Sequence, residues 1–158
     1  MTSIKEVAAI FMVKFKLNQS AYSKFKAQIA DAFATTIATI DEEMDAVIED
    51  SNEFSDLGFD DQDIVDTGRL RDSKLLNVQT EDDGITAEWT WNPHDPETGY
   101  AYAMAVYAGF NAFGKKQIPG RPWPERAIER VDVLKSLATE MKLRGVPAKV
   151  RKKVLGSL

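Results

Sequence analysis

The chain has 158 residues, of which 44% are hydrophobic and 28% are charged, and its net charge is −5. This composition is typical of a globular protein, and the length suits one domain with a hydrophobic core. The absence of Cys excludes disulfides, thiolate nucleophiles and Cys-ligated zinc, and with His94 as the only His we expect no metal site and no cofactor. No apolar stretch approaches the roughly 20 residues that span a bilayer, so we expect neither a signal peptide nor a membrane partner.

The first predicted element is a strand or an extended arm over residues 9–17, where apolar residues alternate with lysines. Asn18 then has the side chain of a helix N-cap. Apolar residues recur at steps of three or four from Tyr22 to Val47, which predicts one long helix ending near Asp50. With roughly 30 residues, about 45 Å at the usual rise, this helix is long enough for another subunit to cover part of its apolar stripe.

Charge is unevenly distributed along the chain. The stretch 41–63 holds eleven acidic residues and no Lys or Arg, and the stretch 142–153 holds six basic residues and no acid. Both stretches could be solvated surface, or copies of the chain could meet acid to base. The basic stretch could also contact nucleic acid, but it has no interleaved aromatic residues to stack on bases.

The segment IVDTGRLRDS, Ile64–Ser73, has two interpretations. In one, Asp66 or Thr67 caps a short helix, and Gly68 lets the backbone turn or a neighbour approach closely. In the other, Asp66 is one of the two carboxylates of a dimeric aspartic protease, which share a proton in tight loops after strands.

The residues after Gly68 favour the helix cap. Arg69 stands where those protease loops have a small residue, and a cation there would keep the carboxylate ionised. Arg69 and Arg71 flank Leu70, so that Leu70 can point inward while both guanidinium groups point outward. The two arginines are then either solvated or available for carboxylates across an interface.

The second half of the chain begins with a predicted hairpin, in which residues 76–80 and 85–91 alternate around an Asp83-Gly84 turn. Paired tryptophans at 89 and 91 are typical of core or interface anchors. His94 lies in a loop between two prolines, which favours a turn over a metal ligand. Tyr100–Gly109 fits either a strand or a short helix.

A predicted loop follows from Gly114 and leads into a last helix, with Pro124 at its first position and Gly145 at its end. The fold class is therefore α+β, with a strand or arm, a long helix, a small antiparallel sheet and a C-terminal helix packed on the sheet. We expect a single domain over residues 1–145, followed by a basic, flexible tail over residues 146–158.

Three motifs together resemble a family. VDTGRLRDS (65–73), YAMAVYAG (102–109) and PGRPWPERA (119–127) are similar to elements of the minor structural proteins at the head–tail junction of tailed bacteriophages, called neck, head–tail connector or tail-completion proteins of the lambdoid type. Their order and spacing agree with the family over roughly residues 10–143. The chain departs from it at Tyr107, where the family has Glu, at Trp123, where it has Phe, in lacking the usual Pro before the DTG stretch, and in an acidic insertion over residues 51–63.

The resemblance implies a non-enzymatic subunit of a ring, six- or twelve-fold, that joins the phage head to the tail and lets double-stranded DNA pass through its lumen without sequence-specific binding. The expected location is the virion, after synthesis in the host cytoplasm, and the expected partners are further copies, the head-completion or connector protein and the tail proteins. A tail-terminator ring protein is the alternative, and a dimeric aspartic protease or a nucleic-acid-binding adaptor is a hypothesis from another class. The residues that the motifs assign to a subunit interface are Asp66, Thr67, Gly68, Arg69, Leu70, Arg71, Tyr102, Gly109, Arg121, Pro122 and Trp123.

Overall fold

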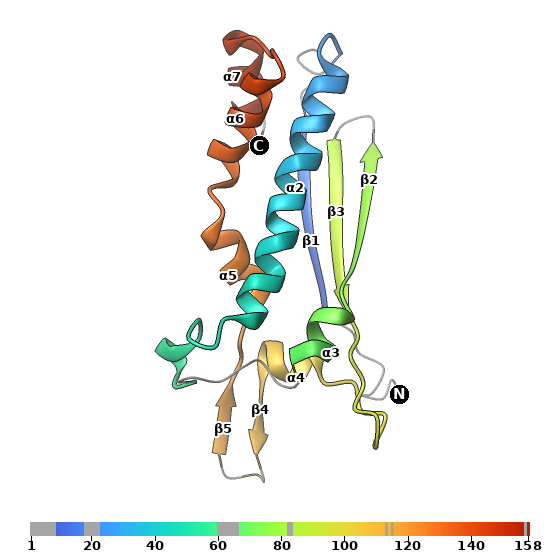
Figure 1. Ribbon diagram of the computed structural model, residues 1–158, viewed down its shortest axis with the longest axis vertical. Helices are drawn as coiled ribbons and strands as arrows, with labels where there is room; N and C mark the ends of the chain where they lie inside the picture. Colours follow the sequence, from blue (N-terminus) through green and yellow to red (C-terminus); the bar gives the residue numbers. More distant parts are fainter. Residues whose placement is uncertain are drawn as a thin grey trace. The chain divides into compact units, whose positions relative to one another are not determined.

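A computed structural model describes residues 9–17, 23–59, 67–81, 84–112, 114, 116–156 and 158 (Figure 1). It contains helices together with small antiparallel sheets, so the predicted α+β class is confirmed. The elements in chain order are β1 (Ala9–Lys16), α2 (Lys26–Glu49), a 3-10 turn (Ser55–Leu57), α3 (Thr67–Asp72), β2 (Leu75–Glu81), β3 (Gly84–Trp91), α4 (Ala103–Ala108), β4 (Gly109–Ala112), β5 (Lys116–Pro119), α5 (Trp123–Arg130), α6 (Val133–Leu143) and α7 (Ala148–Gly156).

The larger sheet has the strand order β1-β3-β2 (Figure 1). Its central strand supplies most of its buried residues. In β3 the odd-numbered residues from Ile85 to Trp91 are buried and the even-numbered ones are half-buried, the pattern of a strand with one face on the core. Every residue of β2 is exposed, as suits an edge strand. Both strands of the predicted hairpin are thus confirmed.

The chain forms two compact units. Unit 1 comprises Met1–Phe11, Met44–Leu76 and Trp89–Ala127, and unit 2 comprises Met12–Glu43, Asn77–Glu88 and Ile128–Leu158. Helix α2 and the three strands of the larger sheet contribute residues to both units. Residue 145, the predicted end of the domain, lies within unit 2 and not at a boundary between the two units. The assignment of 1–145 to a single domain stays a prediction.

The core of unit 2 is the predicted apolar stripe of the long helix. Ile29, Phe33, Ile37 and Ile40 are fully or almost fully buried, and the Phe15 and Phe33 rings pack with their centroids 4.7 Å apart. The stripe therefore arises from the three- and four-residue spacing, as the sequence predicts. The helix begins at residue 26, later than expected, and the predicted cap at Asn18 lies outside the described residues.

The core of unit 1 is aromatic. Trp89, Trp91 and Trp123 are completely buried, and Leu70 of α3 is buried as well. The Trp91 and Trp123 rings meet edge to face with centroids 5.3 Å apart, so the first residue of α5 packs on the central strand. This contact agrees with a C-terminal helix packed on the sheet, and the tryptophans on β3 are core anchors.

The C-terminal part of the chain differs from the prediction in three respects. The expected loop from Gly114 contains strand β5, which pairs with β4 in a separate two-stranded ribbon. The expected single last helix is divided into α5 and α6, because the Asp132 side chain accepts a hydrogen bond from the Lys135 amide (3.1 Å) and starts a new helix. The expected tail forms helix α7, whose Val154 is buried.

Candidate functional site

The three motifs of the predicted interface all fall in unit 1, although 45 residues separate the end of the first from the start of the third. The first forms α3, the second forms α4 and ends at Gly109, and the third leads from the end of β5 into α5. Of the residues assigned to the interface, Asp66 and the side chain of Thr67 lie outside the described part of the chain. Their predicted capping role stays a prediction, whereas the predicted short helix is present.

The second and third motifs meet backbone to backbone. Gly109 pairs with Pro119 at the end of the β4–β5 ribbon, and the Arg121 amide donates a hydrogen bond to the Val106 carbonyl (2.8 Å). A Cβ on Gly109 would lie 2.4 Å from the Ile118 carbonyl oxygen, and one on Gly120 would lie 2.2 Å from the Tyr107 carbonyl oxygen. No side chain fits at these distances, and Gly109 also has a φ of +85°. Glycine is therefore required at both positions by packing.

Aromatic contacts in the core also hold the second and third motifs together. The Tyr107 ring meets the Trp123 ring edge to face with centroids 5.8 Å apart, and the Tyr107 hydroxyl donates a hydrogen bond to a Glu125 carboxylate oxygen. This hydrogen bond, together with burial, raises the pKa of Tyr107 to about 12. Tyr107 thus forms a side-chain hydrogen bond at the position where the phage neck and tail-completion proteins have Glu.

The residues of the third motif have different degrees of exposure. Trp123 is fully buried, Pro122 is half-buried and accepts a hydrogen bond from the Arg126 amide (3.2 Å), and Tyr102 is buried before α4. These positions are scaffold for unit 1. The Trp123 ring is already covered within the chain, and the interface role assigned to this position stays a prediction.

In α3 the predicted pattern is present, since Leu70 is buried and Arg69 is exposed. Arg71 forms ion pairs with Glu49 of α2 and with Asp72, and these two carboxylates raise its pKa. Arg71 is therefore engaged within its own chain. Gly68 differs from the prediction, because its φ is not positive and the nearest described atom to a Cβ there, an Asp72 carboxylate oxygen, lies at an ordinary 3.8 Å.

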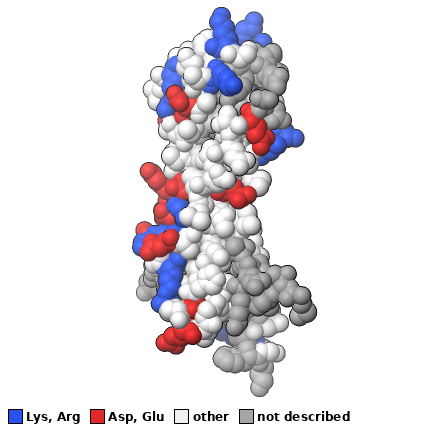
Figure 2. Space-filling view, turned by 90° about the vertical axis from the view of Figure 1, so that its right-hand side faces the viewer, with Lys and Arg blue, Asp and Glu red and all other residues white. Residues whose placement is uncertain are grey.

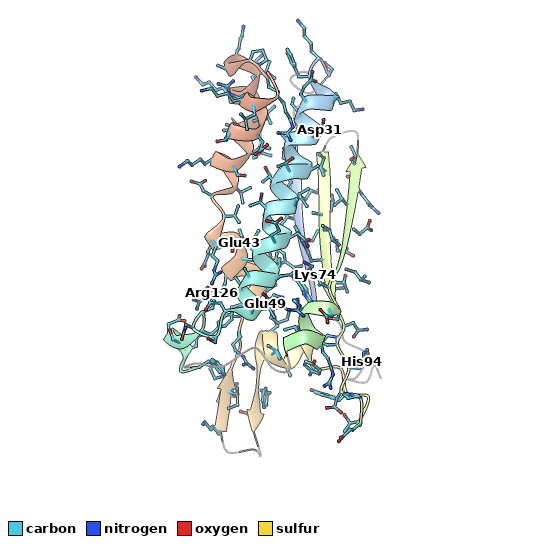
Figure 3. The ribbon with its side chains drawn as sticks, viewed as in Figure 1. Asp31, Glu43, Glu49, Lys74, His94 and Arg126 are labelled. Atoms are coloured by element: carbon cyan, nitrogen blue, oxygen red, sulfur yellow. The ribbon has the colours of Figure 1, made fainter. Side chains whose placement is uncertain are left out.

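Part of the acidic stretch is neutralised within the chain. In unit 1, Asp45 pairs with Lys74 (2.9 Å), Glu49 with Arg71, and Asp56 with Arg126 (2.7 Å). Glu49, Lys74 and Arg126 are labelled in Figure 3. The Arg126 contact lowers the pKa of the Asp56 carboxyl. On the face drawn in Figure 2, red and blue side chains likewise adjoin one another in several places. Some of these carboxylates are therefore already paired within the chain.

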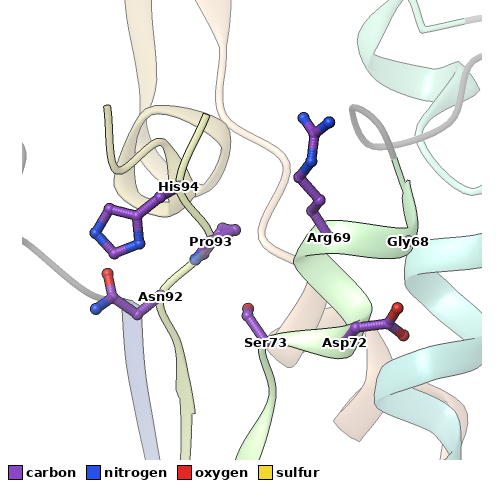
Figure 4. A pocket seen from close by; sticks show the side chains of 7 residues that line it. All are labelled: Gly68, Arg69, Asp72, Ser73, Asn92, Pro93 and His94. Carbon is purple, nitrogen blue, oxygen red and sulfur yellow. The ribbon is translucent and has the colours of Figure 1, made fainter. Parts of the chain in front are cut away.

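A hollow of about 720 Å³ lies beside α3, lined by residues 68, 69, 72 and 73 and by the loop residues 92 to 94 (Figure 4). The Ser73 hydroxyl donates a hydrogen bond to the Leu70 carbonyl (2.8 Å), and the Asp72 carboxylate points away from the His94 ring. The side chains do not converge on one point, so the hollow has no evident nucleophile and base.

The loop after His94 is the turn that its prolines predict. The Asp95 carboxylate accepts hydrogen bonds from the Thr98 and Glu97 amides, both at 2.9 Å, and these bonds lower its pKa. Within the described part of the chain, no group of three or more His, Cys, Asp or Glu side chains is arranged to hold a metal ion. None of the described helices is long and apolar enough to span a membrane.

Two features of this site are absent from the predictions, namely the β4–β5 ribbon and the burial of Arg121. Arg121 is 6% exposed and its guanidinium lies over the Phe59 ring, with its carbon 4.2 Å from the ring centroid. The glycines at 114 and 120 on either side of β5 were the available signal for a ribbon. No sequence signal indicates that Arg121 is buried while Arg69 is exposed.

No protein-family model matches the chain, and no curated protein or solved structure matches it either.

Proposed function

We propose that the protein is a structural subunit of a bacteriophage head–tail junction, a neck or tail-completion protein that forms a ring with its copies. The observation that supports this most is the meeting of the YAMAVYAG and PGRPW motifs at Gly109 and Gly120. Motif residues that are required for backbone packing point to a shared scaffold, whereas motif residues of an enzyme would converge on a substrate.

The chemistry of the motif residues agrees with this proposal. The groups that could serve a reaction make scaffold contacts, as the Ser73 hydroxyl and the Arg71 guanidinium show. Thr67 and Gly68 open a helix, whereas the protease hypothesis requires them in a tight loop after a strand. The protease is therefore the weaker hypothesis, and the basic segment of the adaptor hypothesis is largely helix α7.

Exposed apolar side chains in unit 1 supply surface for contacts between subunits. Leu75 is 71% exposed, Ile10 is 64% exposed and Phe110 of β4 is 44% exposed. Large apolar groups at the surface mark positions where other chains bind. In the proposed ring, neighbouring copies cover such groups, the connector or head-completion protein and the tail bind the two faces, and DNA passes through the lumen. A tail-terminator ring would use the same contacts at the end of the tail.

Native mass spectrometry and negative-stain electron microscopy of the purified full chain test the proposal. We expect ring particles of six or twelve copies, formed by the chain alone or on adding connector and tail proteins. Binding to tails without binding to connectors would identify the tail terminator. A chain that stays monomeric at every concentration and never enters virions would refute both. As a control, Asp66→Asn should leave assembly and particle maturation unchanged, since the proposal gives that carboxylate no catalytic role.

A further inference from the structure

Among the described residues, Arg121 is the only charged side chain in the core. Its backbone is fixed, because its amide donates to the Val106 carbonyl (2.8 Å) and its carbonyl accepts from the Trp123 amide (2.9 Å). Its side chain has the Phe59 ring on one face, but Nε has no hydrogen-bond partner among the described residues. The guanidinium is thus held in place, and its Nε–H has no acceptor in the described part of the chain.

A guanidinium stays charged in a protein, so a buried one requires a counter-charge. Burial alone shifts the pKa of Arg121, downward, and no described carboxylate forms an ion pair with it. The nearby Arg126 differs, since it pairs with Asp56. Stacking on Phe59 compensates one face of Arg121, but its N–H groups lie in the guanidinium plane and need acceptors there.

Arg121 lines a pocket of about 400 Å³. The other walls come from Tyr100 and Tyr102 before α4, from α4 itself, and from Phe110 and Asn111 of β4. Tyrosine, phenylalanine and arginine line this one hollow. These residue types are enriched at the centre of protein–protein interfaces, where most of the binding energy arises. Phe110, 44% exposed, leaves this hollow accessible at its rim.

We infer that this pocket receives a carboxylate side chain from a second copy of the chain, which the Arg121 guanidinium binds through its N–H groups while the tyrosine and phenylalanine rings enclose the apolar stem. A carboxylate is the anion that a guanidinium fork fits. A second copy is the source that charge favours, because each chain carries 25 acidic against 20 basic residues. This inference rests on the proposed self-assembly and names the site where one subunit contacts the next.

Arg121→Met separates this role from a purely structural one. Methionine keeps the unbranched stem and removes the charge. Replacing an unpaired buried charge by an apolar residue of similar volume is neutral or stabilising, so the isolated chain should fold with an unchanged or higher melting temperature. Self-association, measured by sedimentation velocity across a concentration series, should weaken roughly 30-fold or more. Arg121→Lys keeps the charge but not the fork and should give an intermediate loss.

The matched control is Arg126→Met, which removes a neighbouring guanidinium already paired with Asp56 and should leave self-association unchanged. Unchanged self-association of Arg121→Met would overturn the inference while leaving the ring proposal intact. A lowered melting temperature with normal assembly would also overturn it, because the counter-charge would then belong to the same chain. If Arg121→Met weakened only the binding of a different virion protein, and by a similar factor, the carboxylate would belong to that protein. A second copy as its source would then be refuted. A wild-type chain that never self-associates would refute the ring and the inference together.

Discussion

In unit 1, Gly109 and Gly120 lie against backbone atoms at distances where no Cβ fits, whereas the core of unit 2 is a stripe of apolar side chains along α2. Unit 1 also has three buried tryptophan rings and a buried arginine. In unit 2 the described glycines include only one comparable position, Gly84, where a Cβ would lie 2.0 Å from the Phe15 carbonyl oxygen.

The close backbone approaches at Gly109 and Gly120 give a physical reason why the second and third motifs can be recognised in the sequence. A close backbone approach permits only glycine, so such a position can be recognised in the sequence. A helix stripe such as Ile29, Phe33 and Ile37 needs only apolar residues of suitable volume, and many sequences satisfy it. The two units therefore differ in how strictly their sequences are constrained, and substitutions can test this difference.

The largest expected effect is that of Gly109→Ala. The new Cβ would stand 2.4 Å from the Ile118 carbonyl oxygen at a φ of +85°, so β5 must shift away from the start of β4. We expect a loss on the order of 3 kcal/mol in the free energy of unfolding. Hydrogen exchange should show the loss in α4 and β5 first, with α6 and α7 still protected.

Gly68→Ala is the control, because that position is helical and has space for a methyl group. It should stabilise the protein by up to about 1 kcal/mol. Equal loss of protection in both units after Gly109→Ala would break the comparison, since the two units would then unfold as one.

A smaller effect is expected in unit 2 from Asp132→Ala. The variant removes the side-chain acceptor for the Lys135 amide at the start of α6, which should cost about 1 kcal/mol and increase exchange in the first turn of that helix. Glu129→Ala, at an exposed position outside the cap, is the matched control. If both variants behaved alike, the separation of α5 from α6 would not depend on the cap.

The smallest effect concerns alkaline pH and Tyr107. Its folded-state pKa, about 12, lies above the ordinary value of 10.0, so its contribution to stability is complete below about pH 10 and is lost as the pH rises toward 12. Wild type should therefore lose more stability than Tyr107→Phe over this interval in urea unfolding. The variant should also lack the phenolate step near pH 12 in ultraviolet absorbance. A parallel decline of both proteins would show that the Glu125 contact adds nothing to unit 1.

The features that depend on local spacing could be predicted from the residues alone. The α2 stripe, the β2–β3 hairpin, the inward Leu70 and the turn after His94 follow from periodicity and turn residues, which act over a few positions. The remaining features became evident only in the folded chain. The β4–β5 ribbon is too short and too exposed to show alternation, and the end of α5 depends on a cap that competes with a continuous apolar pattern. The burial of Arg121 beneath Phe59 joins residues more than sixty positions apart, and no local pattern distinguishes a buried arginine from an exposed one.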